Sequence, residues 1–137
     1  MSLSFFHMQK NGGRWVFCFF YCYLILMLSS LPGTTVAQIT FNLSDKLLHV
    51  VAYTGLGFLF SWASTRTIQG VILTALFGAL DENYQRMVPG RECDLYDWFA
   101  DCLGAAVGST VYLGLFRFFY SRKKRLPQAD GINIKNR

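Results

Sequence analysis

The chain has 137 residues, of which 53% are hydrophobic, 17% are aromatic and only 15% carry a charge. This composition is typical of a membrane protein and argues against a soluble domain. The formal net charge of +5 is a sum over basic and acidic residues that lie in different segments, so it gives no reason to expect a nucleic-acid partner.

Four runs of residues with few or no charges predict four transmembrane helices. A spanning helix needs about 20 mostly apolar residues, with a range of about 17–25, so the shorter runs must extend into polar flanks. We expect an all-α membrane protein with a cytoplasmic lead at 1–13, a transmembrane domain at 14–120 and a basic, disordered cytoplasmic tail at 121–137. The expected helices cover about 14–31, 46–63, 68–86 and 97–119.

The distribution of Lys and Arg predicts that both termini lie in the cytoplasm. With that orientation, ten basic residues fall in inner segments and three in outer segments, in agreement with the positive-inside rule. Seven of the eight acidic residues then fall on the outer side, all but Asp130. We therefore expect a multi-pass protein of the cytoplasmic (inner) membrane with its polar site on the outer face. The basic cluster from Arg122 to Arg125 would meet anionic headgroups at the inner surface.

The first apolar run, from Trp15 to Leu31, could be a signal peptide or a retained helix. Its 17 uncharged residues exceed the usual signal-peptide core of about 7–15, so we expect a retained helix rather than cleavage after Ala37. Cys18 and Cys22 in this run could form a metal or redox pair. We expect two small apolar side chains instead, because no other ligand types lie at that depth.

A polar stripe follows the expected outer loop at 32–44. Asp45, His49 and Tyr53 recur every four residues and share one helix face, with Lys46 beside them. At about 1.5 Å per residue, His49 lies roughly 6 Å and Tyr53 roughly 12 Å below Asp45. The stripe therefore descends from the outer surface into the bilayer.

The third and fourth predicted helices bring carboxylates to the same level. A short inner turn makes the second and third helices an antiparallel hairpin, so Asp81, Glu82 and Gln85 can meet the start of the second helix. Asp97 and Asp101 open the fourth helix one turn apart. A charge costs about 2.5–3.5 kcal/mol near the centre of a membrane helix and less toward its ends, so we expect these acids to serve a local function.

Small residues predict where the fourth helix packs. Gly104 and Gly108 form a GxxxG motif, which lets two helices pack closely. Asp101 lies on the same helix face, so we expect it to point toward the neighbouring helix. Cys93 and Cys102 would lie on the oxidising side of the membrane. We expect no disulfide between them, because nothing else in the sequence indicates one.

The polar residues of the last three helices converge at the outer membrane boundary, and three interpretations are open. They could form a salt-bridge and hydrogen-bond network that only locks short helices together, because charges inside membranes usually pair. They could form a binding or catalytic site at the outer leaflet. A proton or ion path is the least supported, since it needs ionisable groups through the full depth and almost none lie below Tyr53.

A binding site would use Arg91 to hold a phosphate or carboxylate through two parallel hydrogen bonds. In an enzyme, His49 would be the general acid or base, because its charge can change near neutral pH, and Asp81 or Glu82 would orient it or share its proton. The candidate binding residues are Lys46, Tyr53, Gln85, Arg91, Asp97 and Asp101.

Motifs for metal binding or covalent catalysis are not found. One His among carboxylates suits a hard or borderline ion, but the chain has no second usable His and no HExxH or CxxC. We therefore expect no metal and no cofactor. There is also no GxSxG motif, so covalent catalysis has no support in the sequence.

Two segments carry a longer spaced pattern, DKLLHVVAY at 45–53 and DENYQRMVPGRECDLYDWFADCLGAAVG at 81–108. They resemble the VanZ-like family of small bacterial membrane proteins, named for a protein associated with teicoplanin resistance. The family pattern is roughly D-K-x-x-H-x-x-x-Y, D-E-x-x-Q-x-x-x-P-G-R and D-x-x-x-N-x-x-G, and the likeness covers about 28–110. It matches here at Asp45, Lys46, His49, Tyr53, Asp81, Glu82, Gln85, Pro89, Gly90, Arg91, Asp97 and Gly104.

One position departs from the family pattern. Asp101 stands where the family more often has Asn, which adds a carboxylate to an acidic cluster. Such a carboxylate should be protonated or should find a cation, and Arg91 is the candidate cation.

The resemblance implies a multi-pass protein of the bacterial cell envelope and supplies no reaction. Our leading hypothesis is an outward pocket that binds an anionic lipid or cell-wall precursor headgroup and affects glycopeptide susceptibility. One alternative is a membrane-embedded hydrolase or transferase that uses His49 with Asp81 or Glu82. The other is a structural or accessory subunit with an internal salt-bridge network. Membrane lipids are the expected partners, and the sequence identifies no protein partner.

Overall fold

The computed structural model describes residues 3–39, 45–91 and 93–125, and every regular element in these ranges is an α-helix. The all-α class is therefore confirmed for this part of the chain. The elements are α1 (Leu3–Ser29), α2 (Gly33–Ile39), α3 (Asp45–Ser64), α4 (Thr67–Gln85) and α5 (Leu95–Arg125).

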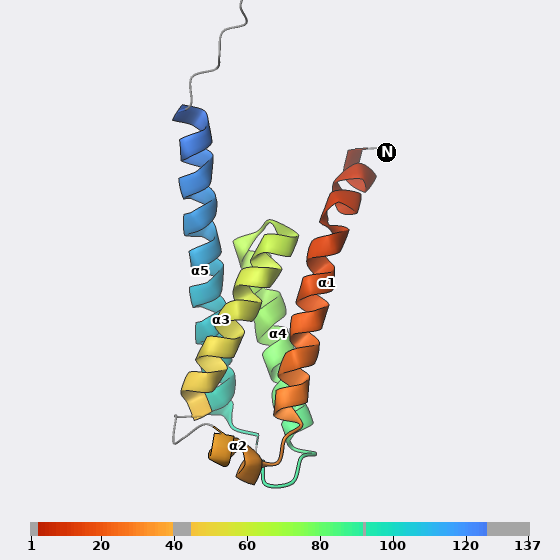
Figure 1. Ribbon diagram of the computed structural model, residues 1–137, viewed down its shortest axis with the longest axis vertical. Coiled ribbons are helices and arrows are strands. Elements are labelled where there is room, and N and C mark those ends of the chain that lie inside the picture. The colour runs from red at the N-terminus through yellow and green to blue at the C-terminus, as the bar shows by residue number, and fades with distance from the viewer. Residues whose placement is uncertain (1–2, 40–44, 92, 126–137) are drawn as a thin grey trace, which may run out of the picture.

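Four helices run along the long axis of the molecule, and the short α2 lies at one end (Figure 1). α5 packs against α3 and α4, and α1 packs against the same two helices. The ends of α1 and α4 and the starts of α3 and α5 meet at the end of the bundle where α2 lies. This connectivity brings the polar segments of four helices to one place.

Three helices are long and apolar enough to cross a membrane, over Gly12–Ser29, Asp45–Ser64 and Leu95–Arg122. We expected a fourth span, which corresponds to α4. Polar residues near both ends of α4, Thr67 and Gln69 at one end and residues 81–85 at the other, lower its mean hydropathy. The helix that contributes most to the polar cluster is therefore the one with the weakest membrane signal.

The interior of the bundle is more polar than its exterior. Large apolar side chains are exposed on all four long helices, and in water such a surface would be an interaction patch. In lipid it is the favourable outer surface, and polar groups gather inside. The buried polar residues are Ser29, His49, Ser61, Thr74, Asp81, Glu82, Gln85, Asp97, Asp101 and Ser109.

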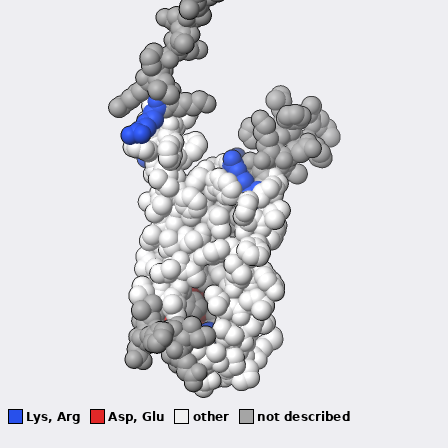
Figure 2. Space-filling model, in the orientation of Figure 1, with Lys and Arg blue, Asp and Glu red and all other residues white. Residues whose placement is uncertain are grey.

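Charge is concentrated at the ends of the bundle. On the face drawn in Figure 2, blue side chains appear at two places near the upper end of the bundle. The surface below them is almost uncharged until an opening at the other end, where red and blue atoms appear. The broad uncharged zone between the two ends is what a lipid-facing surface requires.

Residues 33–39, expected as part of a loop, form α2 instead. The amide of Thr35 donates to the carbonyl oxygen of Pro32 at 2.9 Å, and this bond begins the helix. Proline favours a helix start because its φ angle is already close to the helical value. The Pro32-Gly33 pair, which we interpreted as part of a loop, therefore marks the start of a helix.

The first and the last helix, α1 and α5, are longer than predicted. α1 begins at Leu3, inside the expected lead, and α5 continues to Arg125, inside the expected tail. The predicted disorder of residues 126–137 lies outside the described residues.

Glycines let α3 and α5 approach closely. A Cβ atom on Gly104 would lie 2.6 Å from the carbonyl oxygen of Val50, and one on Gly108 would also meet the α3 backbone. From the other side, a Cβ atom on Gly57 would lie 2.8 Å from the Cα atom of Ala105. Real Cβ atoms do not tolerate these contacts, so this seam requires glycine.

Replacement of Gly104 by Ala should therefore destabilise the fold. We expect a loss of about 1–3 kcal/mol, as for other overpacked positions, measured by thermal unfolding in detergent micelles. Gly114→Ala is the matched control on the same helix, because nothing lies within 4 Å of the added Cβ atom. It should be neutral or stabilising, since Ala favours a helix over Gly by about 0.8–1.0 kcal/mol. Equal melting temperatures for the two variants would contradict the close-packed seam.

Candidate functional site

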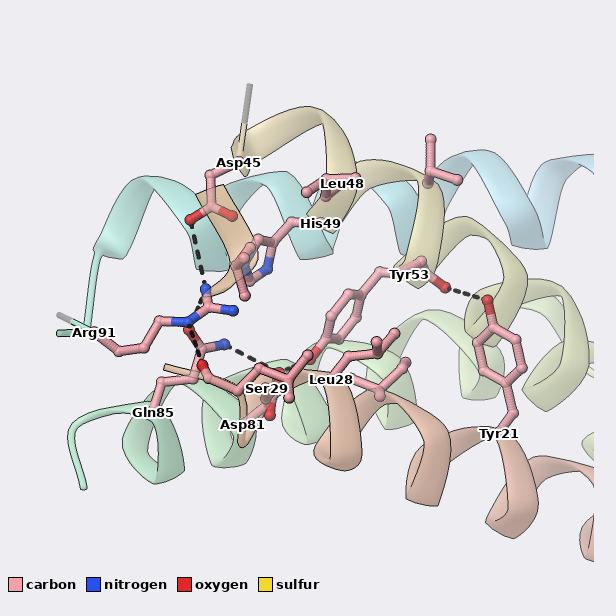
Figure 3. Close-up of a pocket in the computed structure, with 15 residues that line it drawn as sticks. Tyr21, Leu28, Ser29, Asp45, Leu48, His49, Tyr53, Asp81, Gln85 and Arg91 are labelled. Atoms are coloured by element: carbon pink, nitrogen blue, oxygen red, sulfur yellow. Dashed lines mark hydrogen bonds and ion pairs between the residues drawn. The ribbon is translucent and has the colours of Figure 1, made fainter. Parts of the chain in front are cut away.

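The polar residues predicted from the sequence cluster at the α2 end of the bundle (Figure 3). They come from α3, α4, the start of α5 and the turn between α4 and α5, and α1 contributes a serine. Six of these residues are buried, and none of them is more than 8% exposed. They are His49, Asp81, Glu82, Gln85, Asp97 and Asp101.

His49 is held by Asp101. The Nδ1 atom of His49 lies 2.8 Å from Oδ1 of Asp101, and both side chains are buried. Oε1 of Glu82 lies 3.9 Å from the same nitrogen. An ionised Asp101 accepts a hydrogen bond from the Nδ1–H group of His49. The other ring nitrogen, Nε2, takes no part in this bond. The partner of Asp101 is thus His49 rather than the expected Arg91.

Asp81 has a different role from the one expected. Its Oδ2 atom accepts hydrogen bonds from Ser29 at 2.8 Å, Tyr53 at 3.0 Å and Gln85 at 3.3 Å. These donors are neutral and come from α1, α3 and α4. Asp81 therefore ties three helices together, and Asp101 rather than Asp81 orients His49.

Lys46 reaches α5 rather than α4. Its Nζ atom donates to Asp94 and Asp97, at 2.8 Å in each case. The hydrogen bond from Lys46, helped by one from the backbone amide of Tyr96, lowers the pKa of the Asp94 carboxyl because both donors stabilise its ionised form. Lys46 therefore makes two short hydrogen bonds at the start of α5, although half of its side chain is exposed.

Arg91 is held more loosely than Lys46. Its side chain is 11% exposed and lies 3.6 Å from Asp45, 3.5 Å from Oε1 of Gln85 and 3.5 Å from the carbonyl oxygen of Leu31. The turn before it needs Gly90, whose φ of +75° is disfavoured for other residues. None of these contacts of Arg91 has the length of a strong charge-assisted hydrogen bond, about 2.7–2.9 Å.

A cavity of about 410 Å³ opens beside Arg91 (Figure 3). One end is polar and the other is walled by apolar residues of α1, α2 and α3. The polar lining residues are Tyr21, Ser29, Asp45, His49, Tyr53, Asp81, Gln85 and Arg91. The apolar ones are Ile25, Leu28, Leu31, Val36, Leu48, Val51 and Ala52.

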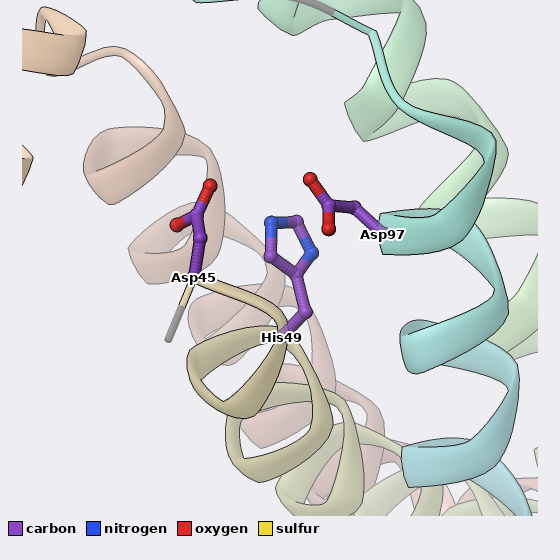
Figure 4. A group of neighbouring side chains, drawn as sticks. All are labelled: Asp45, His49 and Asp97. Atoms are coloured by element: carbon purple, nitrogen blue, oxygen red, sulfur yellow. The ribbon is translucent and has the colours of Figure 1, made fainter. Parts of the chain in front are cut away.

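Two overlapping groups around His49 have the spacing of metal ligands. One consists of Asp45, His49 and Asp97 (Figure 4), and the other of His49, Glu82 and Asp101. Within each group the candidate ligand atoms lie within 4.8 Å of one another. Neither group forms a recognisable sequence motif, because each combines residues from at least two helices that are far apart in the chain.

Two residues of the cluster were missed in the sequence. Ser29 lies in LSSLPG (28–33), which shares the family resemblance, but a serine at the end of an apolar run is too common to single out. Asp94 accepts a hydrogen bond from the amide of Tyr96 at 2.9 Å, and an Asp just before a helix is a recognisable cap.

The cysteines behave as expected in the described part of the chain. Cys93 and Cys102 are free thiols. Cys18 and Cys22 are buried in an apolar cluster with Leu56 and other residues. The structure therefore gives the cysteines no role in the polar site.

Removal of the hydrogen-bond acceptor at Asp101 should destabilise the protein. Asp101→Leu leaves the ring of His49 buried without an acceptor, at a cost of about 1–3 kcal/mol. Asp101→Asn keeps an acceptor oxygen and should unfold near the parental temperature. Thermal unfolding after dialysis against EDTA measures both variants without a contribution from bound metal. Equal losses in the two variants would mean that the charge of Asp101, and not its hydrogen bond, holds His49.

Comparison with known proteins identifies the family of the chain. The sequence model of the family described as VanZ/LLP1 matches residues 3–118, which is most of the chain. Neither a curated protein nor a solved structure matched. The matched range contains the whole polar cluster, from Ser29 to Asp101. The chain therefore belongs to the VanZ/LLP1 family.

Proposed function

We propose that the protein is a multi-pass protein of the bacterial cytoplasmic membrane that binds an anionic amphipathic molecule in the cavity beside Arg91. The ligand class is an anionic lipid or a lipid-linked cell-wall precursor. The observation that carries the proposal is the position of Arg91 at the polar end of an amphipathic cavity. The described hydrogen bonds and the ion pair of its side chain are all 3.5 Å or longer.

Charge distribution supports an outward orientation of the cavity. Arg14, Arg66 and Arg117 lie toward the end of the bundle where α5 ends and α4 begins, and the buried carboxylates lie toward the other end. Under the positive-inside rule the first end is cytoplasmic. α4 then returns across the membrane as a fourth, shorter span antiparallel to α3, and the cavity opens at the outer leaflet.

The difference in polarity between the two ends of the cavity favours an amphipathic ligand. A phosphate or carboxylate at Arg91 would replace long contacts with short, charge-assisted ones. Leu28, Val51 and Ala52 line the apolar part and suit a hydrocarbon chain. The exposed side chains of Leu28 and Val51 continue this wall onto the lipid-facing surface, so a bound lipid would not have to leave the bilayer completely.

In the cell, this binding would act on the supply or the accessibility of an envelope component. A protein that holds a precursor headgroup at the outer surface changes what a glycopeptide antibiotic can reach. An effect on glycopeptide susceptibility is the consequence we propose for this chain.

A hydrolase or transferase is the second candidate, favoured by the pair of His49 and Asp101 at the cavity wall. A His oriented by a carboxylate is suited to general acid or base catalysis. In that case His49→Gln abolishes turnover of the bound lipid but spares its retention. An accessory subunit remains the third alternative and would retain no lipid in its cavity.

Loss of Arg91 should weaken lipid retention. We expect Arg91→Ala to retain roughly a tenth or less of the anionic lipid found with the parent protein, since a charge-assisted hydrogen bond contributes about 1.5–3 kcal/mol. Native mass spectrometry of protein purified from the same membranes measures the bound lipid. Arg86→Ala is the matched control, because Arg86 is exposed and does not line the cavity.

The outcomes separate the candidates. Retention that falls in Arg91→Ala but not in Arg86→Ala supports the cavity as the binding site. Equal retention in all three proteins contradicts it, and the polar cluster would then be an internal brace. Competition with soluble glycerol phosphate tests whether the ligand must be a lipid, because a headgroup site alone would release the lipid to the soluble anion.

A further inference from the structure

We propose that His49, Glu82 and Asp101 form a binding site for one divalent metal ion. The three residues come from α3, α4 and α5 and are 8%, 3% and 0% exposed. Their candidate ligand atoms lie within 4.8 Å of one another. The site is behind the wall of the lipid cavity, and its existence does not depend on lipid binding.

The balance of charge in the cluster supports a cation. Lys46 contacts Asp94 and Asp97, and Arg91 lies nearest to Asp45. Among the described residues, Glu82 and Asp101 have only His49 as a cationic partner, and Asp81 has only neutral donors. Uncompensated carboxylates in a low-dielectric interior are strongly unfavourable, and one divalent ion would compensate two of them.

Each carboxylate of the proposed group has one buried oxygen atom without a hydrogen-bond partner among the described residues. The described residues provide no hydrogen-bond partner for Oε1 of Glu82, Oδ2 of Asp101 or Oδ1 of Asp81, although all three atoms are buried. Buried carboxylate oxygens in native proteins nearly always have a partner. Oε1 of Glu82 faces His49 at 3.9 Å, while its Oε2 atom accepts a hydrogen bond from the amide of Asp94 at 3.1 Å.

The spacing fits a first coordination sphere. Ligand atoms about 2.0–2.2 Å from one ion lie at most about 4.4 Å apart. The Nδ1 atom of His49 lies 2.8 Å from Asp101 and 3.9 Å from Glu82, so these two pairs fall within this limit, and the two carboxylates of the group lie within 4.8 Å of each other. Metal binding would replace the Nδ1 proton. One imidazole with two carboxylates suits Mn²⁺ or Zn²⁺ better than a softer ion.

The neighbouring group of Asp45, His49 and Asp97 is a weaker candidate. The Asp97 carboxylate accepts a hydrogen bond from Lys46 at 2.8 Å, and Asp45 is half exposed and lies nearest to Arg91. Both carboxylates of this group therefore already have a cationic partner, Lys46 for Asp97 and Arg91 for Asp45. A second positive charge there would have to displace one of them.

This proposal differs from the sequence expectation of no metal. The sequence contains one usable His and no ligand motif, and 52 residues separate His49 from Asp101. Asp101 is also the position where the family pattern more often has Asn. The site is therefore a property of this chain that only the packing of α3, α4 and α5 reveals.

Metal content of the purified full-length chain tests the proposal. The protein in detergent is incubated with Mn²⁺ or Zn²⁺, freed of unbound ions by gel filtration and analysed by inductively coupled plasma mass spectrometry. We expect one ion per chain in the parent and at least tenfold weaker binding in Glu82→Gln and Asp101→Asn. Asn83→Ala is the control, because Asn83 is exposed and, among the described residues, its side chain donates only to the carbonyl oxygen of Ala79, and it should bind as the parent does.

Two readouts keep the test decisive if a variant folds poorly. Bound Co²⁺ in the parent protein should give visible absorption bands that EDTA removes, and EDTA should lower the melting temperature of the metal-loaded parent. The absence of bound metal and of any EDTA shift in the parent overturns the proposal. Retention of the ion by folded Glu82→Gln and Asp101→Asn also overturns it, because the metal would then lie elsewhere. Lipid plays no part in these assays, so their failure leaves the proposed lipid binding untouched.

Discussion

The structure depends on the pairing of His49 and Asp101 across the seam between α3 and α5. A buried imidazole and a buried carboxylate are costly without hydrogen-bond partners, and here each is the partner of the other. They meet at 2.8 Å because the glycines of the seam, among them Gly57 and Gly104, let the two backbones approach. The same close packing places Tyr53 against Asp81 and thereby connects α3 to α4.

The two basic residues of the cluster differ in a way that separates structure from function. Lys46 is engaged by two short hydrogen bonds and fastens the start of α5 to α3. Arg91 makes only long contacts and lies at the polar end of a cavity with apolar walls. A cation that the fold leaves under-used is suited to an external anion, whereas the buried acids behind it are suited to a metal ion. The proposed lipid site and the proposed metal site thus share His49 at their boundary.

Much of this arrangement was predictable from helical periodicity. The four-residue spacing of Asp45, His49 and Tyr53 placed them on one face, and the short turn after α3 placed α4 beside it. The choice of partners was not predictable, because it depends on the rotation of each helix about its axis. Asp101 therefore pairs with His49 rather than Arg91. Helix α2 and the role of Ser29 were missed, since their local signals are common in unrelated loops and helix ends.

Photo-crosslinking tests the central claim, an anionic amphipathic ligand in the cavity, most directly. An anionic phospholipid with a diazirine group in its acyl chain is irradiated with the full-length protein in membranes, and the labelled peptides are mapped by mass spectrometry. We predict labelling concentrated on the cavity walls, at Leu28, Val51 and their neighbours, and its loss when excess unlabelled anionic lipid is present. Labelling spread evenly over the exposed apolar faces of α1, α3 and α5, without competition, would contradict the account.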